Sequence, residues 1–351
     1  MDCPRRFPPE WAEQAAVLLA WPDDSGAFRP WLAEVESTYC RIAEAIAARQ
    51  PLLILCRDRA HRQRIQCLLF GRRAELRRVS LIEMAYDDVW VRDTAPLTVE
   101  GADGAVLLDF RFNGWGGKYP HAADAALAGR LHATRLFPEA PLQALPMVLE
   151  GGSVESDGAG SLLTTTRCLL NPNRNPGLSK SDIEAQLREQ FGASRVLWLE
   201  HGHTEGDDTD AHVDTLARFC DPATIAYTAS TDAADPLHAD LEAMARELRQ
   251  FRTAEGQPYR LVALPLPRPI RDEDGQRLPA TYANFLIING AALVPVYGDD
   301  ADCVALERLA ACFPGRTLVP IEATPLIRQY GSIHCMTMHF PHSVALELNH
   351  G

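Results

Sequence analysis

Residues 16–56 of this chain read AVLLAWPDDSGAFRPWLAEVESTYCRIAEAIAARQPLLILC, and this stretch decides the fold. An apolar run at 17–21 stops at Pro22, which is typical of a buried strand. A second apolar run occupies residues 52–56. Between them, apolar residues recur at helical spacing over 31–48, at Leu32, Val35, Tyr39, Ile42 and Ile46. The stretch therefore predicts one strand–helix–strand unit of an α/β protein.

The same order of elements recurs along the rest of the chain. A helix over 59–69 and strands over 80–84 and 89–91 are expected directly after the first unit. Four more units follow, with the strand, helix and strand at 105–110, 121–134 and 147–149; 161–165, 180–191 and 195–199; 224–228, 236–251 and 259–264; and 285–296, 302–313 and 317–321. Five similar units in one chain predict a repeated α/β architecture.

The composition is that of an ordinary globular protein and narrows the choice of partners. Of 351 residues, 46% are hydrophobic, and the net charge of −13 disfavours nucleic acid and anionic membranes and favours a cationic ligand. The N-terminal residues contain no apolar signal segment, and no apolar run approaches the ~18 residues of a membrane span. Nine cysteines without a Cys-x-x-Cys pair fit reduced thiols. We therefore expect a cytoplasmic protein.

One cysteine stands in a setting that suits a nucleophile. Residues 331–338, GSIHCMTM, place Cys335 after a glycine turn and before an alternating, strand-like run. Such a position would hold the sulfur on a rigid edge, although a free cysteine is among the residue types most often buried in a core. Alternation along a strand predicts that His334 points to the opposite face from Cys335.

Residues 200–219, EHGHTEGDDTDAHVDTLARF, crowd acidic residues beside three histidines. His201 and His203 with nearby carboxylates could bind Zn, Mn or Fe, although no His-Glu-x-x-His motif supports a metal. Alternatively, His212 is a general acid/base and Asp214, on the same face of an extended segment, is its charge partner. A solvated acidic loop is a third interpretation.

Two further acidic residues lie where strands are expected to end. In residues 87–99, DDVWVRDTAPLTV, Asp93 is either a turn residue or a site carboxylate beside the ring of Trp90, which would suit a cation. In residues 147–158, MVLEGGSVESDG, Glu150 precedes two glycines that allow either a hairpin turn or the close approach of a ligand. A bound cation would explain a buried glutamate there. Residues 112–120, FNGWGGKYP, lack the spacing of a phosphate loop and predict a loop or lid.

If the repeated units pack around a common axis, their strand ends converge and assemble a single site. That site would contain a thiol, an imidazole and three carboxylates, contributed by Cys335, His212, Asp93, Glu150 and Asp214. Carboxylates raise the pKa of a neighbouring thiol and suit acyl transfer poorly, but they can hold a planar cation through fork-like hydrogen bonds. This chemistry points to attack on a guanidinium carbon.

Across nearly its whole length the chain resembles the agmatine deiminases. These belong to a guanidine-modifying superfamily that also includes arginine deiminases and bacterial peptidyl-arginine deiminases. The resemblance rests on PPEWAEQAAVLLAWP (8–22), DDVWVRDTAP (87–96), FNGWGGKYP (112–120), LEGGSVESDG (149–158), GDDTDAHVDTLARF (206–219), Asn284 and GSIHCMTMHFP (331–341). It implies a five-bladed α/β propeller, the pentein fold, with pseudo-fivefold symmetry and one catalytic domain over residues 1–351.

The resemblance also implies a role for each site residue. Cys335 is the expected nucleophile, His212 the acid/base, and Asp93, Glu150 and Asp214 the guanidinium-binding carboxylates. Further contacts with a small cationic guanidine substrate are expected from Trp90, Trp115, Gly331 and one of Asp207 and Asp208, the latter pair receiving a distal ammonium. The resemblance implies no metal and no cofactor, and it suggests a homodimer.

The implied reaction is hydrolysis of agmatine to N-carbamoylputrescine and ammonia through an S-alkylthiouronium intermediate on Cys335. Another guanidine, such as arginine or a C-terminal peptidyl-arginine, is the alternative substrate. A metal-dependent hydrolase that uses His201, His203 and His212, and a guanidine-binding protein without activity, are the alternatives from other classes.

Overall fold

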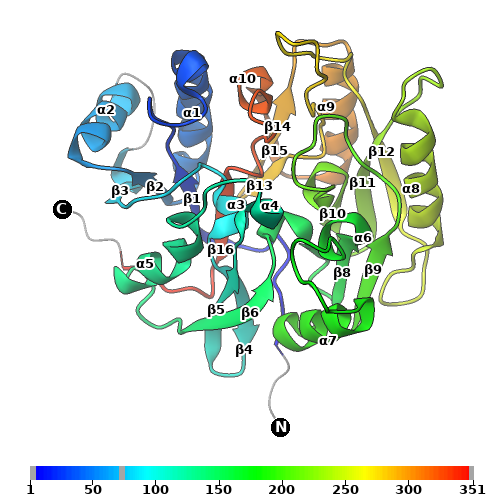
Figure 1. Ribbon diagram of the computed structural model, residues 1–351, viewed down its shortest axis with the longest axis horizontal. Coiled ribbons are helices and arrows are strands. Elements are labelled where there is room, and N and C mark those ends of the chain that lie inside the picture. Colours follow the sequence, from blue (N-terminus) through cyan, green and yellow to red (C-terminus); the bar gives the residue numbers. More distant parts are fainter. Residues whose placement is uncertain (1–4, 71–75, 348–351) are drawn as a thin grey trace.

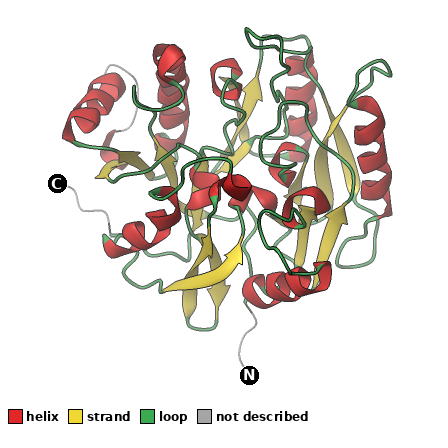
Figure 2. Ribbon diagram, in the orientation of Figure 1, coloured by secondary structure: helices red, strands yellow, loops and turns green. Residues whose placement is uncertain are grey.

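The computed structural model describes residues 5–70 and 76–347. Five small sheets surround a common centre, and the longer helices lie on the outside (Figure 1, Figure 2). This arrangement is the five-bladed α/β propeller that the resemblance implied. In the described part of the chain, no helix combines the length and the apolar character needed to cross a membrane.

Four of the blades repeat one order of strands. The first strand is antiparallel to the second, and the second is parallel to the third after a helical crossover. The strands are β4 (Leu97–Gly101), β5 (Gly104–Arg111) and β6 (Leu142–Val148); β7 (Glu155–Ser156), β8 (Ser161–Thr165) and β9 (Arg195–Leu199); β10 (Ala217–Asp221), β11 (Thr224–Ala229) and β12 (Arg260–Pro265); and β13 (Leu286–Ile288), β14 (Ala291–Val296) and β15 (Thr317–Glu322). The crossovers contain the helices η3 (Asp124–Ala126) and α5 (Leu127–Ala133); α6 (Thr166–Leu169) and α7 (Lys180–Phe191); α8 (His238–Gln250); and α9 (Ala301–Cys312).

The remaining blade joins the two ends of the chain and closes the ring. Its strands, in spatial order, are β16 (Thr337–Pro341), β1 (Gln14–Ala20), β2 (Leu52–Cys56) and β3 (Val79–Glu83). The last strand, β16, is antiparallel to β1, while β1, β2 and β3 are parallel. Its helical elements are η1 (Arg29–Trp31), α1 (Leu32–Ala47), α2 (Arg59–Phe70) and η2 (Leu76–Arg78).

The local sequence explains why these elements form. The apolar strand β2 is buried at every position, as expected for a central parallel strand covered on both faces. Helix α7 begins with a reciprocal capping box between Ser179 and Asp182. It ends at Gly192, which has a φ of +66° and lies so close to the carbonyl oxygen of Arg5 that a Cβ at this position would overlap it. Only glycine can therefore end this helix.

Short helical turns link the blades near the centre of the ring. They are α3 (Val91–Thr94), η4 (Gly151–Ser153), η5 (Val213–Thr215) and α10 (Thr324–Ile327). The first three each precede the first strand of the following blade, and α3 packs against η4, which packs against η5. A further short helix, α4 (Gly114–Gly117), lies in the segment predicted to be a loop or lid.

All five predicted strand–helix–strand units are present, but several details of the prediction are wrong. The strand expected at 147–149 is β6, which spans Leu142–Val148. The expected strand at 89–91 is instead an irregular segment that leads into α3 at Val91. Residues 89–94 are all buried, so the alternation of side-chain types there does not distinguish a buried face from an exposed one. The expected strand at 285–296 is a hairpin of β13 and β14 that turns at Gly290, with φ +71°. The helix expected at 121–134 begins only at Asp124.

Candidate active site

The segments between blades carry the predicted catalytic residues to the centre of the propeller. These residues are Asp93 in α3, Glu150 directly before η4, His212 and Asp214 at η5, and Cys335 in the turn before β16. The packing around Gly152 shows how tightly they meet. A Cβ there would lie 2.7 Å from His212 Nδ1, 3.0 Å from Asp93 Oδ1 and 3.1 Å from Asp214 Oδ2. The residues come together as predicted, and only glycine fits between them.

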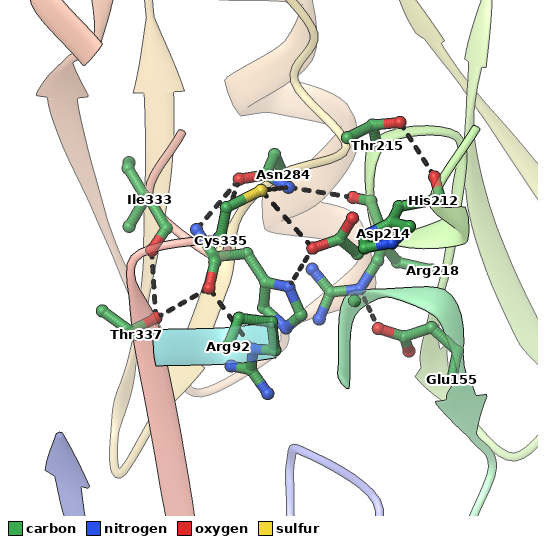
Figure 3. Close-up of polar contacts among 12 residues, drawn as sticks. Arg92, Glu155, His212, Asp214, Thr215, Arg218, Asn284, Ile333, Cys335 and Thr337 are labelled. Carbon is green, nitrogen blue, oxygen red and sulfur yellow. Dashed lines mark hydrogen bonds and ion pairs between the residues drawn. The ribbon is translucent and has the colours of Figure 1, made fainter. Parts of the chain in front are cut away.

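The Cys335 sulfur is held by one amide and faces one carboxylate (Figure 3). Asn284 Nδ2 donates to Cys335 Sγ at 3.1 Å, and Sγ lies 3.6 Å from Asp214 Oδ2. Asn284 Oδ1 also accepts the backbone N–H groups of His334 and Cys335, at 3.0 and 3.3 Å. Asn284 therefore fixes both the turn and its sulfur.

The thiol is neutral before a cation binds. Burial, together with the negative charges of Asp214 and Asp93, raises the pKa of Cys335 well above its ordinary value. The side chain is nevertheless 6% exposed and lines a cavity, so a ligand can reach it. The effect on the thiol matches the expectation from the sequence that converging carboxylates disfavour the thiolate.

His212 is buried between two carboxylates. Its Nδ1 lies 3.6 Å from Asp93 Oδ1 and its Nε2 lies 3.9 Å from Glu150 Oε2, and neither nitrogen has a partner at hydrogen-bond distance in the described part of the chain. Burial alone would disfavour the imidazolium, but Asp93, followed by Cys168 and Glu150, raises the pKa of His212 well above its ordinary value. A protonated imidazole at this position can donate a proton to a group that enters the site.

The carboxylate of Glu150 has a partner that the sequence did not reveal. Arg174 Nε lies 2.9 Å from both carboxylate oxygens of Glu150, and both side chains are fully buried. Burial opposes ionisation of Glu150, but His212 and Arg174 lower its pKa below the ordinary value. Arg174 stands in the segment NPNRNP (171–176), whose Asn and Pro residues look like a surface loop. The only feature of the sequence that could have indicated a role for Arg174 in the site is its position after strand β8 and helix α6 of the third blade.

The histidines of the metal hypothesis do not come together. His201 Nδ1 contacts Glu247 at 2.5 Å and His203 Nδ1 contacts Asp240 at 2.7 Å, so both pair with carboxylates of α8 rather than with His212. Among the described residues, the one group with metal-ligand spacing is Glu150, Cys168 and His212. The combination of His201, His203 and His212 is therefore wrong as a ligand set.

A cavity of about 110 Å³ leads to the sulfur. Aromatic and acidic side chains dominate its wall, and its lining residues are Ala27, Asp88, Trp90, Asp93, Trp115, Tyr119, Asp208, Thr209, Thr215, Gln329, Tyr330, Gly331 and Cys335. None of these described lining residues is a lysine or an arginine. The cavity therefore presents negative charge and aromatic faces, which suit a cation. Asp88 was not predicted, although it stands two residues before the predicted Trp90.

The predicted contacts of the cavity wall are placed as follows. Trp115 adopts a left-handed conformation, with φ +53°, and its Nε1 donates to Asp93 Oδ2 at 3.0 Å. Gly331 packs so closely on Trp90 that a Cβ at this position would overlap the indole ring. Asp208 faces the cavity, where it accepts from the hydroxyl of Tyr119 and lies 3.7 Å from Lys118 Nζ. Trp90, Trp115, Asp208 and Gly331 thus all line the cavity, and their contacts with a ligand stay a prediction.

Asp207 does not face the cavity, which corrects one of the two assignments for the distal ammonium. Its carboxylate accepts hydrogen bonds from Thr209 N and Oγ1, at 3.1 and 2.6 Å, and from Ala211 N at 2.5 Å. The acidic side chain thus caps its own loop. Aspartate commonly bonds backbone N–H groups two to four residues ahead in this way, so adjacency to Asp208 gave no information about direction.

His334 was also misjudged from the sequence. Residues 333–336 form a turn, and the strand begins only at Thr337, so alternation does not apply. His334 Nδ1 lies 2.7 Å from Asp214 Oδ2 and Nε2 lies 2.6 Å from Glu10 Oε2. The side chain is therefore in contact with the candidate site through Asp214.

Comparisons with known proteins agree with this geometry. The family model of the Porphyromonas-type peptidyl-arginine deiminases matches residues 6–341. The agmatine deiminase of Stutzerimonas stutzeri is 32% identical, with 95% of each chain covered. A crystal structure from Porphyromonas gingivalis, provisionally named an arginine deiminase, superposes with a TM-score of 0.91 at 46% identity and covers 97% of this chain and 99% of its own. A cysteine-to-serine variant of the C. jejuni agmatine deiminase, with substrate bound, has a TM-score of 0.88 at 33% identity, with 96% of both chains covered.

These matches extend over the whole propeller and include all of the segments that meet at Cys335. They confirm the resemblance that the motifs indicated. Because the match is continuous from the first blade to the strand that closes the ring, this chain belongs to the Porphyromonas-type peptidyl-arginine deiminase family.

Proposed function

We propose that this protein hydrolyses agmatine to N-carbamoylputrescine and ammonia. The charge of the cavity carries the proposal, because Asp88, Asp93 and Asp208 line it and none of its described lining residues is a lysine or an arginine. Agmatine has a guanidinium at one end and an ammonium at the other, and both ends then meet carboxylates. The α-carboxylate of arginine would instead approach acidic side chains and be repelled. The similarity to agmatine deiminases from other organisms supports the same choice.

Asp88 is the best candidate to receive the distal ammonium. Asp208 already contacts Lys118 and Tyr119, which offset its charge. The carboxylate of Asp88 accepts a hydrogen bond from the backbone N–H of Val89 at 2.7 Å, and no cation within the described residues forms an ion pair with it. Burial raises the pKa of Asp88 to about 6, so its carboxylate is ionised at neutral pH but costly to keep in the cavity wall. An ammonium beside it would offset that cost.

The guanidinium activates its own nucleophile in this scheme. Asp93 and Asp214 raise the pKa of the Cys335 thiol before substrate binds. A bound guanidinium places positive charge between these carboxylates and the sulfur. The thiol pKa then falls, its proton passes to solvent and the thiolate forms only when the substrate is present.

The first half of the reaction forms a covalent intermediate. The Cys335 thiolate attacks the guanidinium carbon, and Asp93, Glu150 and Asp214 orient the three nitrogens. Protonated His212 donates its proton to the departing nitrogen, the C–N bond breaks and ammonia leaves. The S-alkylthiouronium that remains on Cys335 keeps the positive charge of the guanidinium, so the carboxylates continue to hold it.

The second half restores the enzyme. His212, now neutral, removes a proton from water, and the hydroxide attacks the same carbon. The C–S bond breaks, the hydroxyl proton of the adduct passes to the departing Cys335 sulfur and restores the neutral thiol, and the carbon becomes the carbonyl of a ureido group. The sum of both halves is agmatine plus water giving N-carbamoylputrescine plus ammonia, with no redox change.

The direct test is to incubate the purified protein with agmatine, arginine and a peptide with a C-terminal arginine. Ammonia and the ureido product are then measured for each compound. We expect turnover of agmatine far above that of the others, and loss of turnover in Cys335→Ala. Preference for arginine or the peptide would establish the alternative substrate, and ammonia from none of them would refute the proposal.

The role of Asp88 is tested with butylguanidine, which has the guanidinium and a four-carbon chain but no ammonium. Loss of a hydrogen bond to a charged group costs about 1.5–3 kcal/mol, so Asp88→Asn should lower kcat/KM for agmatine by roughly 10–100-fold. The value for butylguanidine should change little. Asp103→Asn, an equal charge change at the exposed turn between β4 and β5, is the matched control.

A further inference from the structure

His334 lies between two buried carboxylates and contacts both. Its Nδ1 is 2.7 Å from Asp214 Oδ2, its Nε2 is 2.6 Å from Glu10 Oε2, and the side chain is only 2% exposed. A neutral imidazole has one N–H group and one lone pair, so it would turn a lone pair toward one of the two carboxylates. The doubly protonated imidazolium donates to both of them.

Charged side chains of both signs surround His334. Three carboxylates face one another below the site, from Glu10 before β1, Glu155 in β7 and Asp214 in η5. Two guanidinium groups lie among them. Arg218 pairs with Glu155 and lies 3.1 Å from Glu10, and Arg92 lies 3.4 Å from Glu10. With His334 charged, three cations balance three anions.

A second histidine in the same network does not supply this charge. His339 Nδ1 lies 3.7 Å from Glu10 Oε2 and 3.3 Å from Arg92 Nη1. Burial lowers the pKa of His339 to about 3, so it is neutral at physiological pH. These ring contacts are with Glu10 and Arg92 rather than with Asp214, which makes His339 a natural control.

The contact with His334 leaves one oxygen of Asp214 available. Oδ2 accepts from His334 and lies 3.6 Å from Cys335 Sγ, while the buried Oδ1 has no hydrogen-bond partner among the described residues. We propose that His334 is a positioning residue, held as an imidazolium that fixes Asp214 by one oxygen and keeps the carboxylate ionised so that the other oxygen can bind a guanidinium. This inference rests on the proposed guanidine chemistry of the site.

The proposal predicts how binding changes with pH when the imidazolium is removed. Burial opposes ionisation of Asp214, but the hydrogen bond and charge of His334, with help from His212 and Arg218, keep its pKa below the ordinary value. Asp93 and the Cys335 thiol also face this carboxylate. In His334→Gln the largest favourable contribution is lost, so the pKa of Asp214 rises. The carboxylate then takes up a proton as the pH falls, and guanidinium binding weakens.

The experiment measures the dissociation constant of butylguanidine by calorimetry between pH 4.5 and pH 8 in a Cys335→Ser background. Butylguanidine has no ammonium, so the titration of Asp88 does not affect the result. The parent, the His334→Gln variant and the His339→Gln control are compared. We expect the ratio of the dissociation constants of His334→Gln and the parent to grow by about tenfold for each pH unit below the raised pKa of Asp214.

The possible outcomes distinguish a failure of the role proposed for His334 from a failure of the proposed guanidine chemistry. A ratio that stays constant from pH 8 to pH 4.5 overturns the role of His334, because a loss of packing alone weakens binding equally at every pH. An equal pH effect in His339→Gln also overturns it. If butylguanidine fails to bind even the parent, the proposed guanidine chemistry is at fault rather than the role of His334.

A measurement on the unaltered protein remains decisive if His334→Gln does not fold. In protein labelled with ¹⁵N-histidine, the ring nitrogens of His334 are observed by NMR at pH 7 to 8 and assigned by comparison with a His334→Asn sample or by their coupling to backbone signals. We expect an attached proton on both nitrogens. A single protonated ring nitrogen would overturn the proposal.

Discussion

Replacing Arg174 with methionine tests how the site keeps a carboxylate ionised at its centre. Arg174 Nε donates to both oxygens of Glu150 at 2.9 Å. Its two terminal nitrogens donate to Asp210 Oδ2 at 2.7 Å and to the carbonyl oxygen of Thr209 at 2.8 Å. Methionine is of similar length but donates no hydrogen bond. In Arg174→Met, the fully buried Glu150 would therefore lose its hydrogen-bonded cation and keep only His212, 3.9 Å away, as a cationic neighbour.

The structure sets the expected magnitude. Removing one partner of a buried ion pair costs about 3–5 kcal/mol, because the remaining charge is left without compensation. An exposed pair contributes only about 0–1 kcal/mol. The chain offers such a pair as a control, since Arg268 Nε lies 2.7 Å from Asp299 Oδ2 but the arginine side chain is 76% exposed. Arg174→Met should thus lower the free energy of unfolding by several times more than Arg268→Met.

Urea unfolding followed by circular dichroism gives the free energies, and ammonia release from agmatine gives the activity. Activity should fall with stability in Arg174→Met, because Glu150 becomes protonated or moves. Adding Glu150→Gln removes the unpaired charge, so the double variant should be less destabilised than the sum of the single changes. The reasoning is refuted if Arg174→Met costs no more than Arg268→Met, or if the two changes at the buried pair are additive.

Three further outcomes are expected. The Cys335→Ser variant should release no ammonia but should still bind agmatine. At one hundred times the dissociation constant, agmatine should raise the variant's free energy of unfolding by about 2.7 kcal/mol in urea titrations. Absence of this stabilisation would contradict the assigned site. The Gly152→Ala variant should have a kcat/KM at least tenfold lower, because the added Cβ would lie 2.7 Å from His212 Nδ1. Gly129→Ala is the control and should leave the kinetics unchanged, because its added Cβ would meet none of the described residues within 4 Å. Burial raises the pKa of Asp88 to about 6, so this carboxylate is ionised above that pH and neutral below it. The preference for agmatine over butylguanidine in kcat/KM should therefore decline as the pH falls through 6. A preference that is constant down to pH 5 would exclude Asp88 as the ammonium partner.

The repeated unit of the fold was predictable because its signals are long. Strand β2 is five consecutive buried apolar residues, and α7 carries a capping box and a terminal glycine that define both ends. Two of the first strands of the blades gave no comparable signal. Strand β7 has two residues and β13 has three, which is too short for any periodicity to appear. Their place in the sheets is fixed by pairing with the next strand rather than by their own sequence.

The five residues that converge at the candidate site were also predictable, whereas the residues that support them were not. Asp93, Glu150, His212, Asp214 and Cys335 stand in motifs with Gly, Pro or aromatic neighbours. Arg174 looks like a residue of a polar loop, and Glu10 looks like the exposed start of a strand. Both are buried only because segments far apart in the sequence bring charges together, as when Glu10 meets His334. No local pattern records such a contact.

The carboxylates beside Cys335 explain how a site rich in negative charge can still use a nucleophilic thiol. Asp214 and Asp93 hold the pKa of Cys335 high, so a neutral molecule that enters the cavity meets an unreactive thiol. A guanidinium offsets the same carboxylates as it binds, and only then does the thiolate become favourable. Selection of the substrate and activation of the nucleophile thus depend on one set of charges. Neutralising either carboxylate would lower the thiol pKa before substrate binds and would also weaken guanidinium binding. In Asp214→Asn, iodoacetamide should therefore alkylate Cys335 more readily, while the activity of the protein toward agmatine should fall. Mass spectrometry of the peptide that contains Cys335 measures the alkylation. Reduced alkylation in this variant would show instead that Asp214 activates the thiol directly.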